Sequence, residues 1–426
     1  MAVLLLAALV LAGGLSLGRR LEQASPREIK VAPYRLPLLS PGTRHEIEQL
    51  KARVEQNPEG FLDRAALAQA YLARARETRD PAMVLLAEES ARLSLKSMAH
   101  FNPGAELVLA HLEVARHDFR GALERISRIL QEDPTQHAAR ALKVTALLAL
   151  GQVKPASELA DQLALQQPGL TSSVLRAQTL VARGLDEEAA RELWKGIDRE
   201  QAGEVASSLQ ARVLLARLYA RHGKLRLAEV VLGSALTIGR DPAALAELGR
   251  VDLARGRLTA AHEHFTESYA LGRDPGALQG VAMALEGLKL EREAAEARQR
   301  VEDAYRRELE GQQTMGHRRA LAGLLLDRGE AREAVELMQA ELALRRDFET
   351  LMTAARALRL AGRPEDGWAL MEEAFAQGYR DAPAWRERAA LAEALKRAEE
   401  VARCRQEALR INPVSFPELP LPPVEH

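Results

Sequence analysis

Apolar positions recur at helical spacing along most of the chain, from His45 to about Pro413. They form stripes of about a dozen residues, interrupted by Gly or by Asp-Pro and Asn-Pro pairs, which end one helix and begin the next. The β-branched alternation and the hairpin dipeptides that indicate strands are missing from this region. The pattern therefore predicts an all-α protein built from many short helices.

The stripes repeat with a period of about 33 residues, as expected for stacked structural units. Pro242 and Pro275, which each begin a stripe, are 33 residues apart. A Gly separates two stripes at Gly151, Gly184, Gly223, Gly256, Gly329 and Gly362. Five residues later a small residue follows, at Ala156, Ala189, Ala228, Ala261, Ala334 and Gly367.

This spacing has a simple physical explanation. The Gly ends a first helix in the left-handed conformation, and the small residue lets the second helix approach the first closely. A larger apolar residue four positions further on, as in Leu193 or Phe265, fills the space between units. Because one helix pair cannot bury its own apolar face, neighbouring pairs must stack. The prediction is an α-solenoid of about ten or eleven antiparallel helix pairs.

The array resembles tetratricopeptide repeats, whose unit is a helix-turn-helix. The clearest copy is 243–275, with Leu248-Gly249, Gly256, Ala261 and Phe265 at the family's positions. The resemblance implies a right-handed superhelix, in which the first helix of each pair lines a concave groove that binds peptides. An insertion around Asp80-Pro81 and a displaced Ala in 287–316 leave the repeat boundaries open.

The two ends of the chain differ from the array. Residues 2–18 are uncharged and apolar and would span roughly 25 Å as a helix, so we expect 1–20 to be a membrane anchor or a signal segment. Charges follow this segment at Arg19 and Arg20, which favours an anchor with the repeats in the cytoplasm. A cleaved signal peptide and a periplasmic location are the alternative. Residues 21–44 form a Pro-containing linker, 45–413 the solenoid, and 414–426 a Pro-rich tail.

Composition narrows the function. The 59 Lys and Arg residues balance 60 Asp and Glu residues, so we expect no nucleic-acid partner. Cys404 is the only cysteine, and His262 and His264 point to different sides of a helix, so we expect no metal and no cofactor. The chain carries no phosphate-binding loop and no motif of a catalytic nucleophile, and we predict that it is not an enzyme.

The first helices offer a candidate binding row. Matched to the family's groove positions, the N-terminal units present mostly neutral residues and the later units present arginine. The predicted groove arginines are Arg217, Arg221, Arg250, Arg319, Arg356, Arg359 and Arg386. Guanidinium groups suit carboxylates, so acidic segments or a C-terminal carboxylate are the expected ligands. The family's clamp of Lys and Asn is not reproduced, and pairing of these arginines with neighbouring acidic residues is the alternative.

Taken together, the sequence predicts a membrane-tethered scaffold or adaptor at the inner (cytoplasmic) membrane, with a peptide segment or partner helix in its groove. The alternatives are a periplasmic assembly or export factor and, from another class, an enzyme subunit with an unrecognised site. The start of the chain also resembles bacterial inner-membrane tetratricopeptide proteins that regulate lipopolysaccharide assembly. Those proteins end in a metal knob of paired cysteines, which a chain with only Cys404 does not have.

Overall fold

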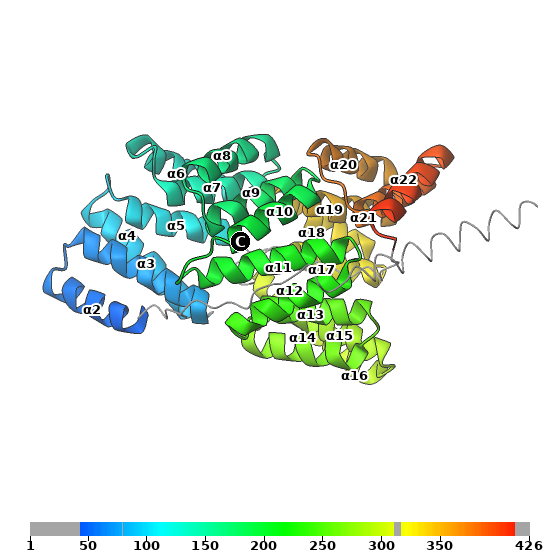
Figure 1. Cartoon of the computed structure of the whole chain (residues 1–426), viewed down its shortest axis with the longest axis horizontal. Helices are drawn as coiled ribbons and strands as arrows, with labels where there is room; N and C mark the ends of the chain where they lie inside the picture. Colours follow the sequence, from blue (N-terminus) through cyan, green and yellow to red (C-terminus); the bar gives the residue numbers. More distant parts are fainter. Residues whose placement is uncertain (1–42, 79, 311–316, 414–426) are drawn as a thin grey trace, which may run out of the picture.

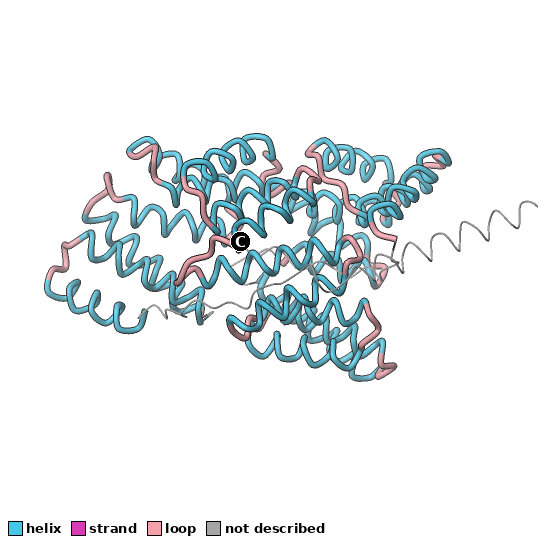
Figure 2. Tube along the Cα trace, in the orientation of Figure 1, coloured by secondary structure: helices cyan, strands magenta, loops and turns pink. Residues whose placement is uncertain are grey.

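The computed structural model describes residues 43–78, 80–310 and 317–413, which form 21 helices and no strand (Figure 2). In chain order the helices are α2 (Thr43–Gln56), α3 (Phe61–Thr78), α4 (Pro81–Ser97), α5 (Pro103–Ala115), α6 (Phe119–Glu132), α7 (His137–Ala149), α8 (Val153–Gln166), α9 (Leu170–Ala182), α10 (Asp186–Ile197), α11 (Val205–Arg221), α12 (Leu225–Ile238), α13 (Pro242–Ala254), α14 (Leu258–Gly272), α15 (Pro275–Gly287), α16 (Glu291–Glu310), α17 (Arg318–Asp327), α18 (Ala331–Leu344), α19 (Phe348–Leu360), α20 (Pro364–Ala376), α21 (Ala382–Ala394) and α22 (Ala398–Ile411).

After α2 the helices form ten antiparallel pairs, from α3/α4 to α21/α22, stacked side by side along the chain (Figure 1). Each first helix contacts its own second helix, and from α3 to α15 and from α17 to α21 it also contacts the first helices of the neighbouring pairs. The second helices pack against the first helices on either side of them. The first helices therefore form the inner layer of a curved stack, and the predicted α-solenoid is confirmed.

The turns within the pairs follow the predicted glycine rule. Among the described residues, all six turn glycines have a positive φ, between 71° and 84°. Three turns lack a glycine and place His117, Lys289 or Lys396 in the same left-handed region, with φ of 59° to 60°. The left-handed conformation costs an L-residue roughly 1–2 kcal/mol. Because these three turns contain no glycine, the glycine spacing did not reveal them in the sequence.

The small and large residues of each pair occupy the predicted places. The alanines five positions after the turn glycines have no exposed surface, namely Ala156, Ala189, Ala228, Ala261 and Ala334. The larger residues that follow are at most 1 % exposed: Leu193, Leu232, Phe265, Met338 and Met371. These side chains belong to apolar clusters that run from one pair into the next. Stacking, not the individual pair, therefore provides the core.

The stack curls until pairs far apart in the sequence meet. The turn between α7 and α8 contacts the loop before α19, where the Arg346 N–H donates to the Ala149 carbonyl over 2.9 Å. The end of α11 contacts the end of α22, where the Asn412 side chain donates to the Arg221 carbonyl over 3.0 Å. Figure 1 shows the resulting arrangement, with α20 to α22 beside α8 to α10. We call this line of contacts the seam.

The predicted anchor at residues 2–18, the linker up to residue 42 and the tail 414–426 lie outside the described residues. Within the described ranges, none of the helices has the length and apolar character needed to cross a membrane.

Candidate partner-binding wall

The predicted groove arginines all lie on or beside first helices of the later pairs. Arg217 and Arg221 come from α11, Arg250 from α13, Arg319 from α17, Arg356 and Arg359 from α19, and Arg386 from α21. We call the surface formed by the first helices α3, α5, α7, α9, α11, α13, α15, α17, α19 and α21 the inner wall.

Glu247 joins two of these arginines at the start of the row. Its carboxylate lies 2.5 Å from both Arg217 and Arg250, and Glu247 and Arg250 are only 4 % and 8 % exposed. Burial raises the pKa of the Glu247 carboxyl, but the two guanidinium groups outweigh it and hold that pKa below its usual value. Burial also lowers the pKa of Arg250. This triad therefore stabilises the contact between α11 and α13 before any ligand is present.

The next arginines are paired in the same way across neighbouring first helices. Arg319 lies 2.8 Å from Glu349 and 3.4 Å from Asp347, the N-cap residue of α19. Arg356 lies 2.9 Å from Asp327. Arg359 donates two hydrogen bonds, of 2.6 and 2.9 Å, to the Glu387 carboxylate on α21. A ladder of alternating guanidinium and carboxylate groups thus links α17, α19 and α21.

Arg221 and Arg386 differ from the ladder and from each other. Arg221 is enclosed at the seam, 3.8 Å from Asp186 and 3.9 Å from Asp381, with its guanidinium over the Tyr379 ring at 5.1 Å. Arg386 is half-buried, and among the described residues the structure shows no carboxylate partner for it. Six of the seven predicted arginines therefore have intramolecular carboxylates, and Arg386 keeps its donors available.

The sequence contains a signal for these pairs that the groove prediction did not use. The acidic partner of Arg217 lies 30 residues further along the chain, and those of Arg319 and Arg359 lie 28 residues further along. That separation is close to one repeat, so these three pairs join adjacent first helices. Arg356 pairs in the opposite direction, with Asp327, 29 residues before it. An acidic residue about one period after or before an arginine is therefore the signature of a ladder between repeats.

The N-terminal part of the inner wall has a different character. His111, on α5, is half-buried, and burial and the nearby Arg76 lower the pKa of its imidazole to about 3. Its side chain is therefore neutral at physiological pH. This agrees with the largely uncharged surface predicted for the N-terminal units.

One of the two histidines of α14, His264, contacts the first helix of its own pair. His264 Nδ1 lies 2.7 Å from an Asp252 carboxylate oxygen on α13, which ties the second helix of the pair to the first. Across the part of the chain that the structure describes, no three His, Cys, Asp or Glu side chains gather as metal ligands do.

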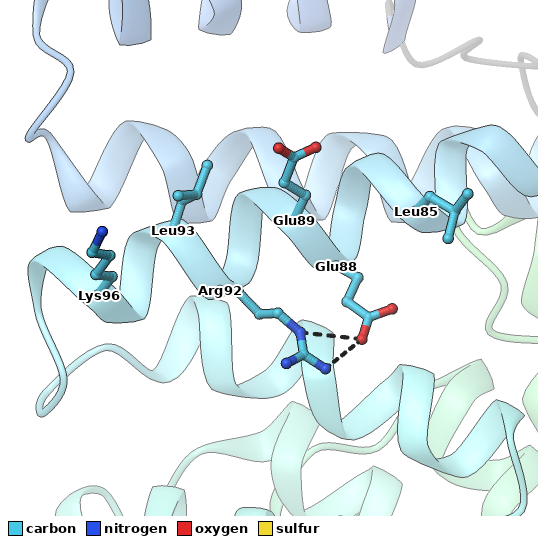
Figure 3. A pocket seen from close by; sticks show the side chains of 6 residues that line it. All are labelled: Leu85, Glu88, Glu89, Arg92, Leu93 and Lys96. Carbon is cyan, nitrogen blue, oxygen red and sulfur yellow. Dashed lines mark hydrogen bonds and ion pairs between the residues drawn. The ribbon is translucent and has the colours of Figure 1, made fainter.

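A shallow hollow lies on one face of α4 (Figure 3). It is lined by Leu85, Glu88, Glu89, Arg92, Leu93 and Lys96, and the Arg92 guanidinium donates to the Glu88 carboxylate. All six side chains come from this one helix. Small-molecule sites are concave and enclose most of their ligand, so we assign no ligand to this hollow.

The fold and the inner wall define the chain as an α-solenoid of stacked helix pairs. Residues 113–184 match the family model "Tetratricopeptide repeat", which supports the interpretation of the array as tetratricopeptide repeats. No curated protein matches the chain.

Three solved structures illustrate the likeness in fold. TTC0263, a tetratricopeptide protein of Thermus thermophilus, is 23% identical, with 43% of this chain and 98% of that chain covered and a TM-score of 0.39. The type IV pilus biogenesis factor PilW is 19% identical over 47% of this chain and 92% of that chain, with a TM-score of 0.41. The anaphase-promoting complex tetramer Cut9–Hcn1 is 15% identical over 88% and 71%, with a TM-score of 0.42.

Proposed function

We propose that the chain is a protein-interaction scaffold that holds a segment of a partner protein against the inner wall. The observation that carries this proposal is the extent of that wall, since first helices contact one another in two long runs, from α3 to α15 and from α17 to α21. A curved surface of this kind suits an extended segment or an amphipathic helix. The apolar segment 2–18 would tether the scaffold to the inner membrane with its repeats in the cytoplasm.

The charge arrangement suggests which part of the wall receives an acidic group. Arg217 and Arg250 are committed to the buried Glu247, and separating such a pair leaves an uncompensated charge. Arg386 has no competing carboxylate among the described residues, and the neighbouring Arg356 is 31% exposed. We therefore propose that an acidic side chain or a C-terminal carboxylate of the partner binds at Arg386, with Arg356 and Arg359 as its neighbours on the wall.

Site-specific crosslinking tests this proposal. A photoreactive amino acid replaces Ala390, which is half-buried one helical turn from Arg386 on α21, or, as the matched control, Arg405 on α22, which is 61 % exposed and pairs with Glu393. We expect the variant at position 390 to crosslink one protein reproducibly in membranes and the variant at position 405 to leave that protein unlinked. Equal crosslinking from both positions would show that the inner wall is not the binding surface.

Reporter fusions after residues 44 and 413 test the tether. A cytoplasmic signal at both points supports the anchor, whereas a periplasmic signal favours the alternative, an assembly or export factor delivered by a signal peptide.

A further inference from the structure

The seam joins parts of the chain that are about 190 to 225 residues apart in sequence, roughly six helix pairs along the stack. At one end, His117 Nδ1 in the α5–α6 turn lies 3.2 Å from a Glu341 carboxylate oxygen on α18, and the Arg345 guanidinium lies 5.8 Å from the centre of the Phe119 ring. At the other end, Asn412 binds the Arg221 carbonyl. One turn of the superhelix therefore contacts the next along four consecutive pairs, α5/α6 to α11/α12.

Backbone groups lie close together in the middle of the seam. The Arg346 N–H donates to the Ala149 carbonyl across the seam, and Gln377 Nε2 donates to the Arg346 carbonyl over 2.9 Å on the C-terminal side of it. A methyl group added at Gly151 would lie 2.7 Å from the Arg346 carbonyl oxygen, and one added at Gly184 would lie 2.7 Å from the Gly378 carbonyl oxygen. Real side chains do not approach backbone this closely, so the two glycines permit the contact.

The seam is held by fewer apolar side chains than the stack. Its contacts are mainly hydrogen bonds, ion pairs and a cation over an aromatic ring, with Val181 of α9 packed against the cluster that contains Phe348 and Tyr379, whereas neighbouring pairs share continuous buried clusters. A cleft of about 470 Å³ also remains at the seam, lined in part by Leu123, Leu150, Leu342 and Leu344. Contacts with little buried apolar surface open more readily than a packed core. The seam can therefore part while the helix pairs stay stacked.

We propose that the seam is a gate to the inner wall. When it is closed, the inner wall is reached only from the two ends of the superhelix, by a segment with a free end. When it opens, the wall also accepts a segment flanked by folded domains. The gate rests on the proposed function, because it concerns how a partner segment reaches the inner wall.

Two double glycine variants distinguish an effect on the seam from the strain of placing alanine in a left-handed turn. Gly151→Ala with Gly184→Ala places methyl groups against the opposite backbone, whereas Gly256→Ala with Gly329→Ala places them in open space. The four glycines have closely similar φ values, 72°, 71°, 72° and 84°, so both double variants carry the same cost of a left-handed alanine. Any difference between them reports on the seam. Gln377→Ala is a second, milder variant. It removes the hydrogen bond that holds the Arg346 carbonyl in place opposite Gly151 and adds no backbone strain.

Two measurements on the full chain follow, neither of which needs the partner. Hydrogen exchange reports the Arg346 amide, which the closed seam protects. The second measurement uses Gln178→Cys, away from both ends of the inner wall, and compares its reaction with a small maleimide and with a maleimide carried on a small folded protein. Gln178 is half-buried on α9 and lies six residues before its turn glycine, as Arg217 and Arg250 do. The Cys404 thiol is fully buried, and its modification is followed separately by peptide mass. We expect the seam variant to exchange the Arg346 amide faster and to raise the relative rate of the bulky reagent about tenfold, as for a tenfold larger open population. The control variant should leave both unchanged, and Gln377→Ala should change both in the same direction but less.

Each of the remaining outcomes contradicts one specific claim. If exchange rises and access of the bulky reagent does not, the seam exists but does not gate the wall, and the proposal is wrong. If the seam variant keeps its helical circular dichroism and shows neither change, the seam itself is wrong. Failure of the crosslinking at position 390 would overturn the proposed function while leaving these two results intact.

Discussion

Individual charged residues of the inner wall stabilise the fold through contacts within the chain. Asp347 is the clearest case, because it caps α19 by accepting the Thr350 N–H over 3.1 Å and also pairs with Arg345 and Arg319. Burial raises the pKa of the Asp347 carboxyl, but Arg345, Arg319 and the capping hydrogen bond lower it to about 2 overall. Arg319 was predicted from the sequence as a groove residue, but Asp347 and Arg345 were not identified. The contact of Arg319 with Asp347 depends on the packing of α17 against α19, which no local pattern encodes.

Asp347→Asn keeps a capping side chain and removes the charge. The folded-state pKa lies below the unfolded value, so the charge contributes stability above pH ~4 that is lost as the pH falls towards ~2. We expect the free energy of unfolding to drop by about 2 kcal/mol at pH 7 and by about half as much at pH 3, which lies between the two pKa values. Urea unfolding at the two pH values measures this. Asp327→Asn is the control, because its carboxylate is 49 % exposed and an exposed pair with Arg356 contributes little. Equal losses for both variants would show that burial of Asp347 is not the cause.

At the scale of the helix pair, close approach of backbones sets the stacking. The Phe265 ring packs over Gly249 in its own pair and over Gly280 in the next, and it is 1 % exposed. The repeat pattern predicted Gly249 and Phe265, since both occur at the family's positions. Gly280 was not predicted, because its role depends on the neighbouring pair and its position does not recur along the chain.

Gly280→Ala tests this packing. The added methyl would lie 2.4 Å from the Phe265 ring, which has no room to move, so overpacking should cost about 1–3 kcal/mol despite the better helix propensity of Ala. Gly233→Ala, in the exposed interior of α12 with nothing within 4 Å, should instead stabilise the protein by up to about 1 kcal/mol. Thermal unfolding of both variants decides the matter: a stabilised Gly280→Ala variant would mean that the ring shifts freely.

At the scale of the whole molecule, the sequence predicted a linear stack of helix pairs. The structure adds the seam, where pairs far apart in the sequence meet. Turn glycines and small residues recur with the repeat, so composition and spacing were enough to predict the stacked pairs. The seam has no such periodic signal, because His117, Glu341 and Asn412 meet only after the curvature of some six pairs has accumulated. Small rotations between neighbouring pairs determine that curvature, and they depend on side-chain packing at every interface.

The seam makes the two ends of the array unequal, and this gives a test at the scale of the whole molecule. In a simple solenoid only neighbours along the stack protect the ends, and α3 has more of them than α21, because α2 also packs against α3. Here α21/α22 gains the contacts of Asp381 and Asn412 with Arg221, whereas the seam begins only at His117, beyond α3/α4. We expect native-state hydrogen exchange to be slower in α21 than in α3. We also expect the difference to shrink in the Gly151→Ala, Gly184→Ala variant and to persist in the Gly256→Ala, Gly329→Ala variant. Closure of the superhelix can protect the C-terminal pair only by holding it against α11. Equal hydrogen exchange in α3 and α21 of the unmodified chain would therefore show that the seam adds no stability.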